Sequence, residues 1–138
     1  MDKFGKAVVA IIENNGNILI GKKQQDSTDP LTNTWHIPGG KNKNGESDEE
    51  ALRREMMEEL GVLIRIERLL DESIQLRKET TFHVAWYLCH LDPENQEIVS
   101  GSDLKEARFV AKKDTFLICS EKASSLWPKK VREYLNPE

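Results

Sequence analysis

The chain is poor in cysteine, in long apolar runs and in clustered positive charge, and each scarcity excludes a class of protein. Cys89 and Cys119 are its only cysteines among 138 residues, and their spacing fits neither a metal-binding nor a redox motif. They are expected to be reduced, buried thiols. The longest early apolar run, residues 7–12, is too short to cross a membrane, and no signal-peptide organisation precedes it. We therefore expect a soluble, cytoplasmic protein without a membrane partner.

Basic clusters and domain linkers are missing as well. The sequence has 20 Lys and Arg against 24 Asp and Glu, which gives a net charge of −4, and it contains no basic run. Proteins that bind duplex nucleic acid neutralise its phosphates with a basic surface, so duplexes are not expected as partners. An apolar content of 38% without repeats or low-complexity segments fits one domain over residues 1–138. Both a monomer and a homodimer agree with these features.

One dense motif lies between Gly40 and Val62. It reads GKNKNGESDEEALRREMMEELGV and fits, without a gap, the pattern G, five residues, E, seven residues, R-E-apolar-x-E-E-x-G-apolar. At average residue usage, the probability of a chance match in a chain of this length is below about one in a million. The motif is therefore specific enough to support a functional interpretation.

The second half of the motif predicts a helix with defined ends. Ser47, with Glu50 three residues later, forms a capping box, so the helix should begin there. Gly61 is suited to the position just beyond the last helical residue. One face of the helix carries an apolar stripe that should pack on a core, made of Leu52, Met56 and Leu60.

Three carboxylates share the neighbouring face of this helix. Glu55, Glu58 and Glu59 stand at positions i, i+3 and i+4, where like charges destabilise a helix by about 0.2–0.5 kcal/mol per pair. Residues 46–59 hold seven acidic side chains against two arginines, a net charge of −5. Clustered oxygen ligands of this kind suit Mg²⁺ or Mn²⁺. The alternative is an ordinary solvated acidic face.

The segment before the motif, WHIPGGK at residues 35–41, favours the metal site over that alternative. Gly39 and Gly40 let the backbone approach a ligand closely, and Pro38 stiffens the entry to the loop. Carbonyl groups of the loop can complete the oxygen shell of a metal ion. Lys41 can reach a phosphate oxygen. The loop and the acidic helix together are interpreted as one site.

The motif and its lead-in resemble those of Nudix hydrolases, and WHIPGGK is similar to the lead-in of the MutT-like branch. The resemblance implies an α/β (α+β) fold, the Nudix-type α/β/α sandwich with a mixed β-sheet. It also implies metal-dependent hydrolysis of a nucleoside diphosphate linked to another group X. Glu55, Glu58 and Glu59 are then ligands of Mg²⁺ or Mn²⁺, with the carbonyl of Gly40 as a further ligand. Such ions neutralise a polyanion and activate water.

The same resemblance assigns roles to neighbouring residues. Arg54 and Glu46 form an ion pair that orients the first catalytic carboxylate. Related enzymes often take a general base from a later loop, and here Glu106 matches the usual E-x-x-aromatic pattern. Glu55 is the alternative base, and a plain surface role for Glu106 stays open. The candidate substrate contacts are Lys23, Lys41 and Gly39.

The substrate is less defined than the chemistry. Branches of the family that cleave ADP-ribose or diadenosine polyphosphates usually carry a Pro or a Tyr beyond the motif, where this chain has Arg77, Lys78 and Glu79. The default is therefore a nucleoside triphosphate, ordinary or oxidised, cleaved to the monophosphate and pyrophosphate. The alternatives are another substrate class such as ADP-ribose, a non-catalytic nucleotide-binding regulatory module, and a purely structural acidic domain without metal affinity.

Residue patterns predict the remaining elements. The expected strands are 5–13 and 17–22, which form a hairpin, followed by 62–70, 82–91, 97–100 and 107–110, with a polar loop at 24–34 and helical structure from Lys112 onward. His36, His83 and His90 share no ligand spacing and are expected to pack in the core. Trp127 is expected to anchor the C-terminal segment in the core rather than to stack on a base.

Overall fold

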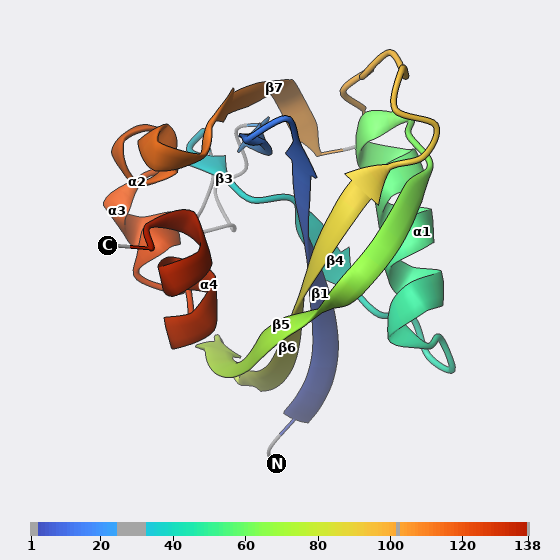
Figure 1. Ribbon diagram of the computed structural model, residues 1–138. Helices are drawn as coiled ribbons and strands as arrows, with labels where there is room; N and C mark the ends of the chain where they lie inside the picture. The colour runs from blue at the N-terminus through green and yellow to red at the C-terminus, as the bar shows by residue number, and fades with distance from the viewer. Residues whose placement is uncertain (1–2, 25–32, 102, 138) are drawn as a thin grey trace.

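The computed structural model describes residues 3–24, 33–101 and 103–137 (Figure 1). Strands and one long helix come first in the chain, and short helices end it. The elements in chain order are β1 (Lys3–Asn14), β2 (Asn17–Lys23), β3 (Trp35–His36), β4 (Gly39–Lys41), α1 (Asp48–Leu60), β5 (Ile64–Arg77), β6 (Thr80–Leu91), β7 (Leu104–Ala111), the 3₁₀ helix η1 (Lys112–Asp114), α2 (Thr115–Ile118), α3 (Glu121–Ser124) and α4 (Lys129–Leu135).

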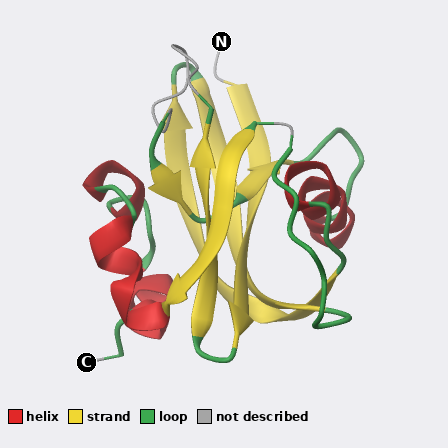
Figure 2. Cartoon of the chain, turned by 90° about the horizontal axis from the view of Figure 1, so that it is seen from above, coloured by secondary structure: helices red, strands yellow, loops and turns green. Residues whose placement is uncertain are grey.

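The strands form a mixed sheet between two helical layers. Its strand order is β3-β2-β1-β6-β5, with β4 paired to β1 and β7 paired to β2. Strand β1 runs parallel to β6, whereas β5 runs antiparallel to β6. Helix α1 covers one face of the sheet and α2–α4 cover the other, as Figures 1 and 2 show. The α/β/α sandwich expected from the sequence is confirmed.

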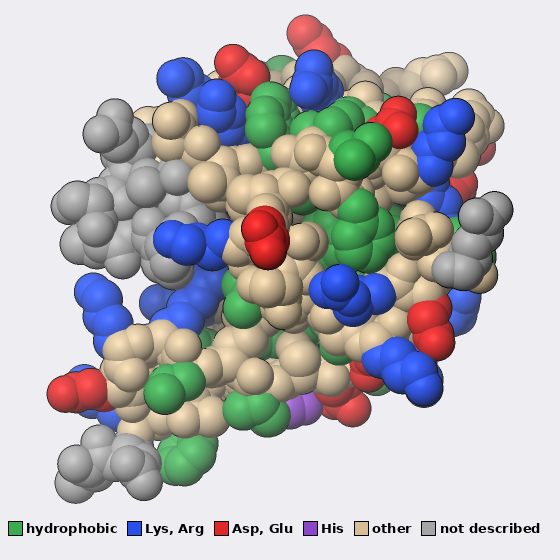
Figure 3. Space-filling model, turned by 90° about the vertical axis from the view of Figure 1, so that its left-hand side faces the viewer, with side chains coloured by type: hydrophobic (Ala, Val, Ile, Leu, Met, Phe, Trp, Pro, Cys, Tyr) green, Lys and Arg blue, Asp and Glu red, His purple; other side chains and the backbone are tan. Residues whose placement is uncertain are grey.

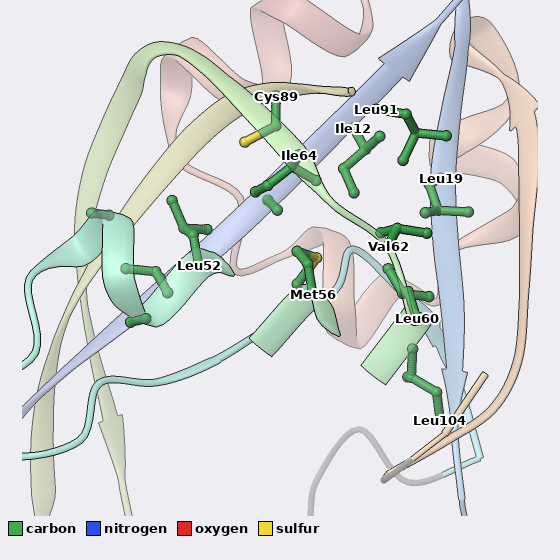
Figure 4. Close-up of a cluster of buried hydrophobic side chains, with 14 residues drawn as sticks. Ile12, Leu19, Leu52, Met56, Leu60, Val62, Ile64, Cys89, Leu91 and Leu104 are labelled. Atoms are coloured by element: carbon green, nitrogen blue, oxygen red, sulfur yellow. The ribbon is translucent and has the colours of Figure 1, made fainter. Parts of the chain in front are cut away.

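Alternation along the central strand divides the interior into two cores. Val8, Ala10 and Ile12 of β1 point toward α1, because successive side chains of a strand face opposite sides of the sheet. Figure 4 shows Leu52, Met56 and Leu60 of α1 packed in this first core. The second core lies under the C-terminal helices and includes Ile11, Trp86, Trp127, Val131 and Leu135.

Helix α1 begins and ends where the sequence predicts. The Ser47 hydroxyl accepts the backbone N–H of Glu50 at 3.1 Å, and the Glu50 carboxylate accepts the N–H of Ser47 at 3.0 Å. Gly61 follows the last turn with φ 65°, in the left-handed region that favours glycine. The hydroxyl of Tyr87 on β6 donates to Asp48 at 2.7 Å, so the start of the helix is attached to the sheet.

The strands after α1 differ from the prediction in extent. Strands β5 and β6 form one long hairpin whose turn includes Lys78 at φ 55°. The strand expected at 97–100 is wrong. The N–H of Val99 donates to Leu60 O at 3.0 Å, and the N–H of Gly101 donates to Glu59 O at 2.9 Å. These backbone groups satisfy the carbonyls at the end of α1 and therefore form no ladder.

Two further predictions concern histidines and the polar loop. His36 is buried as expected, but core packing is wrong for His83 and His90. His83 lies 3.0 Å from a Glu72 oxygen and His90 lies 2.6 Å from a Glu67 oxygen, both at partly exposed positions. Most of the loop expected at 24–34 lies outside the described residues.

The remaining expectations on buried residues are confirmed. Cys89 and Cys119 are free and buried, and Trp127 is buried, with its ring in T-shaped contact with Phe116 at 4.9 Å between centroids. None of the helices in the described ranges is long and apolar enough to span a membrane.

Candidate functional site

Helix α1 brings two of its carboxylates against strand β4. Glu59 is 5% exposed, and Glu55 lies directly against Gly40. A Cβ built on Gly40 would stand 2.2 Å from Glu55 Cδ, so only glycine leaves room for this carboxylate. Glu58, one turn further round the helix, is 44% exposed. The three glutamates of the motif therefore differ in surroundings, from buried to solvent-facing.

Arg54 holds the acidic side chains around it in place. Its guanidinium donates to both carboxylate oxygens of Glu46, at 2.7 and 2.8 Å. It also donates to Glu55 at 2.9 Å and to Glu58 at 3.2 Å, and to the carbonyl of Lys41 at 3.0 Å. The hydrogen bonds from Arg54 lower the pKa of Glu46 to about 2. The ion pair predicted between Arg54 and Glu46 is present and includes the first motif carboxylate, Glu55.

The buried carboxylates carry an electrostatic cost without a cation. Burial raises the pKa of Glu59 to about 8, the negative charge of Glu55 adds to the rise, and Lys23 opposes it. Burial also raises the pKa of Glu55, although Arg54 counters this shift. The Oε2 atom of Glu59 is buried without a hydrogen-bond partner. A buried acceptor of this kind requires either a proton or a cation.

The donors at this point fit a hard divalent cation. They are carboxylate oxygens beside a glycine that leaves its backbone open, a set that suits Mg²⁺ or Mn²⁺ better than softer metals. In the described part of the chain, no three Asp, Glu, His or Cys side chains lie close enough together to hold a metal ion. Arg54 engages one oxygen each of Glu55 and Glu58. Metal binding would therefore require the carboxylates to move closer together while Arg54 keeps its bond to one oxygen of each.

A cleft of about 1080 Å³ leads away from these carboxylates. Its acidic end is lined by Glu55, Glu59 and Asp103, together with Lys23 and Gly40. Its floor is a face of the sheet, which we call the apolar floor, formed by Phe82, Val84 and Trp86 of β6. Residues 75–80 of the β5–β6 hairpin also line the cleft, as do Ala123, Leu126 and Trp127 of the C-terminal segment.

The comparison with family models agrees with this geometry. The model for the NUDIX domain matches residues 3–132, nearly the whole chain. The chain belongs to the Nudix family. Its long hairpin, capped helix and cleft are thus parts of a Nudix domain, and the motif from Gly40 to Val62 is its Nudix motif.

Three curated relatives share parts of this Nudix sequence. The ADP-ribose pyrophosphatase of Methanocaldococcus jannaschii is 34% identical over 103 residues, which are 75% of this chain and 59% of that protein. The CTP pyrophosphohydrolase of Escherichia coli is 40% identical over 60 residues, 44% of this chain and 43% of that protein. Nucleoside triphosphatase NudI of Enterobacter is 44% identical over 59 residues, 43% of this chain and 41% of that protein. The aligned segments thus span about half the length of these relatives.

Solved structures support the fold of this Nudix domain. The MutT protein from Methanosarcina mazei superposes with a TM-score of 0.76 at 19% identity, covering 99% of this chain and 93% of that one. The E. coli ORF135 protein gives a TM-score of 0.71 at 22% identity, covering 91% and 86%. At this identity the likeness concerns the MutT-like fold alone.

The cleft gathers six of the residues singled out from the sequence. They are Lys23, Gly39, Gly40, Lys41, Glu55 and Glu59. Glu58, Arg54 and Glu46 lie behind them in the ion-pair network. Glu106 is exposed on β7 opposite Lys22 of β2 and is not among the described residues that line the cleft. Its role as a base stays a prediction.

The sequence analysis did not single out one acidic residue of the cleft. Asp103 lies at the acidic end, and its charge raises the pKa of both Glu55 and Glu59. In the sequence it ends Gly101-Ser102-Asp103, residue types that are common in turns. The local sequence therefore contains no signal that distinguishes Asp103 from an ordinary turn residue.

Proposed function

We propose that this Nudix protein is a Mg²⁺- or Mn²⁺-dependent pyrophosphohydrolase. Its substrate is a nucleoside diphosphate linked to X, foremost a nucleoside triphosphate, ordinary or oxidised, which it cleaves to the monophosphate and pyrophosphate. The observation that carries the proposal is one cleft lined both by the carboxylates of α1, with the buried Glu59 Oε2 lacking a hydrogen-bond partner among the described residues, and by the apolar floor. A metal-bound diphosphate and a planar base would occupy these two regions.

The carboxylates of α1 carry the metal chemistry in this proposal. Glu55, Glu58 and Glu59 hold the cation with the carbonyl of Gly40, and the bound cation neutralises phosphate charge and lowers the pKa of water. Arg54 keeps Glu55 oriented between Glu46 and the cleft. Lys23 and Lys41, which also line the cleft, are the candidate contacts for phosphate oxygens.

The apolar floor supports binding of a nucleotide base by stacking, with few hydrogen bonds that distinguish one base from another. Phe82, Val84 and Trp86 alternate along β6 on the face of the strand that lines the cleft. The indole N–H of Trp86 already donates to Ser73 at 2.9 Å, so it is engaged within the sheet. Stacking on such a surface tolerates every base, because each base has an aromatic face. We therefore propose a preference for the triphosphate group over any particular base.

A second substrate class has specific support. The relative from M. jannaschii, an ADP-ribose pyrophosphatase, aligns over more of this chain than the other two curated relatives. Residues 75–80 of the β5–β6 hairpin also line the far end of the cleft, where the group X of a longer substrate would lie. ADP-ribose is therefore the alternative substrate. A regulatory module that binds nucleotides without turnover is a third possibility, in which the same cleft binds but does not hydrolyse.

A nucleotide panel tests these proposals. The purified chain is incubated with each of the common nucleoside triphosphates, 8-oxo-dGTP and ADP-ribose, with Mg²⁺ or Mn²⁺ and with excess chelator. We expect pyrophosphate and a monophosphate from triphosphates, only when metal is present. AMP and ribose 5-phosphate as the main products would assign the enzyme to ADP-ribose instead. Nucleotide binding without any product would make the chain a binding module, and undiminished hydrolysis in chelator would exclude the metal mechanism.

A further inference from the structure

The loop before β7 is fixed to two elements that build the acidic end of the cleft. The N–H of Gly101 donates to Glu59 O at 2.9 Å, which attaches the loop to the end of α1. On its other side, the N–H of Gln24 donates to Asp103 O at 2.8 Å, which attaches it to the end of β2. Gly101 and Asp103 are thus each joined by a backbone hydrogen bond to an element beside the carboxylates of α1.

The residue that follows Asp103 is buried in the first core. Leu104 is 2% exposed and packs in the first core, against Gly21 of β2. The adjacent Asp103 is exposed and lines the cleft beside Glu55 and Glu59. Buried Leu104 and the backbone hydrogen bond of Asp103 together fix the backbone at Asp103 beside the acidic end.

A second observation points to a cation at this end. Glu59 is 5% exposed, and its Oε2 atom is buried without a hydrogen-bond partner among the described residues. Three carboxylates, those of Glu55, Glu59 and Asp103, line this end of the cleft together with Lys23 and Gly40, and Asp103 interacts electrostatically with the other two. Mutual repulsion disfavours such a grouping unless a multivalent cation lies between the oxygens.

We propose that Asp103 is the acidic residue from outside helix α1 that faces the bound divalent cation, a different residue from Glu106, which the sequence pattern suggests as a general base. Glu106 is exposed on β7, in register with Lys22, and is not among the described residues that line the cleft. The inference rests on the proposed function, because it takes the cation to be Mg²⁺ or Mn²⁺. Asp103 would hold the cation together with Glu55 and Glu59.

Manganese titration followed by electron paramagnetic resonance tests the assignment without turnover. Free Mn²⁺ is measured against the wild type, Asp103→Asn and, as a matched control three residues away, Glu106→Gln. We expect Asp103→Asn to weaken Mn²⁺ affinity by about ten- to a hundredfold, the usual loss when a group around a metal is removed. Glu106→Gln should stay within about twofold of the wild type. Asp103→Glu, which keeps the charge, should recover part of the affinity.

The outcomes separate this inference from the proposed function. Wild-type affinity in Asp103→Asn, or an equal loss in Glu106→Gln, would overturn the assignment of Asp103 alone. Failure of the wild type to bind Mn²⁺ at millimolar concentrations would overturn the metal-dependent function itself. Thermal unfolding in chelator checks the fold. Asp103→Asn should melt at or above the wild-type temperature, because it removes repulsion and its side chain is exposed.

Discussion

Glu59 combines three properties in one side chain: it is buried, it has an oxygen without a partner, and its pKa is raised to about 8. Glu59→Gln keeps the shape and removes the charge that a cation requires. We expect kcat to fall by about a hundredfold or more, the scale seen when a catalytic electrostatic contact is lost. Steady-state kinetics with saturating Mg²⁺ measures this. The matched control is Glu49→Gln on the exposed first turn of α1, and a loss under about threefold for Glu59→Gln would contradict its role as a ligand.

Arg54 joins four oxygen-bearing groups through one planar guanidinium. Arg54→Ala removes the guanidinium that donates to Glu46 and Glu55, so in chelator we expect a loss of about 2 kcal/mol in the free energy of unfolding. Arg54→Lys should recover little of this, because an ammonium cannot reproduce the fork. Urea unfolding measures both, with Lys105→Ala as an exposed control. If Arg54→Lys were as stable as the wild type, the bidentate geometry would be irrelevant.

The sequence predicted these residues for reasons that the structure makes clear. Glu55, Glu59 and Arg54 occupy one helix whose phase fixes their relative directions, so spacing alone places them together. Asp103 could not be found in this way. Its position depends on hydrogen bonds from the loop backbone to Glu59 O and from Gln24, contacts between segments far apart in the chain.

Strand β4 has only three residues, yet it brings the backbone to the carboxylates. A Cβ at Gly40 would stand 2.2 Å from Glu55 Cδ, and one at Gly39 would stand 2.3 Å from the backbone oxygen of Val8. Gly40→Ala should therefore displace Glu55 and lower kcat by about a hundredfold. Its unfolding midpoint should change little, because a side chain can turn away.

The neighbouring substitution provides the contrast. Gly39→Ala meets the backbone of β1 rather than a side chain, so the strand pairing must shift and the protein should lose stability. Kinetics and thermal unfolding of both variants check the pair. Equal loss of stability in both, with equal activity, would show that Gly40 serves the fold rather than the carboxylate.

Among the elements, α1 was predictable almost to the residue because its caps are local. The capping box of Ser47 and Glu50 marks the start of the helix, and Gly61 marks its end. Strand β3, with two residues, and β4 are too short to show a period of two. Strand β5 continues past the Asp71-Glu72-Ser73 segment, where register shifts around residues 66–71 absorb the irregularity. The residue pattern at 97–100 predicted a strand, but the backbone there hydrogen-bonds to the last carbonyls of α1 instead.

The assembled molecule builds its cleft from segments that are distant in sequence. Residues near 23, 40, 55–59, 84–86, 103 and 127 meet only because β1 runs parallel to β6 while α1 and the C-terminal helices cover opposite faces. Figure 3 shows the face nearest the C-terminal helices, where positive and negative side chains are both scattered among hydrophobic ones. The motif thus predicts the chemistry from sequence, while the substrate contacts depend on this long-range arrangement.

The stability of the whole domain should depend on pH through Glu59. Its folded pKa of about 8 lies above the ordinary 4.5, so the folded state binds a proton that the unfolded state releases between these values. In chelator, the contribution of Glu59 to stability is therefore full below about pH 4.5 and is lost as the pH rises toward 8. Since other groups also titrate, the measurable quantity is the difference between the wild type and Glu59→Gln in unfolding free energy at each pH.

Divalent metal should reverse this trend, because a cation and a proton compete for the same carboxylate. We expect Mg²⁺ to raise the wild-type melting temperature more at pH 8 than at pH 6, and metal binding at pH 6 to 7 to release about one proton. Thermal unfolding with and without Mg²⁺, together with calorimetry in buffers of different ionisation enthalpy, measures both effects. Glu59→Gln should release fewer protons and lose the difference between the two pH values. An equal Mg²⁺ stabilisation at both pH values in the wild type would mean that Glu59 is ionised before metal binds, and that a fixed positive charge already compensates it.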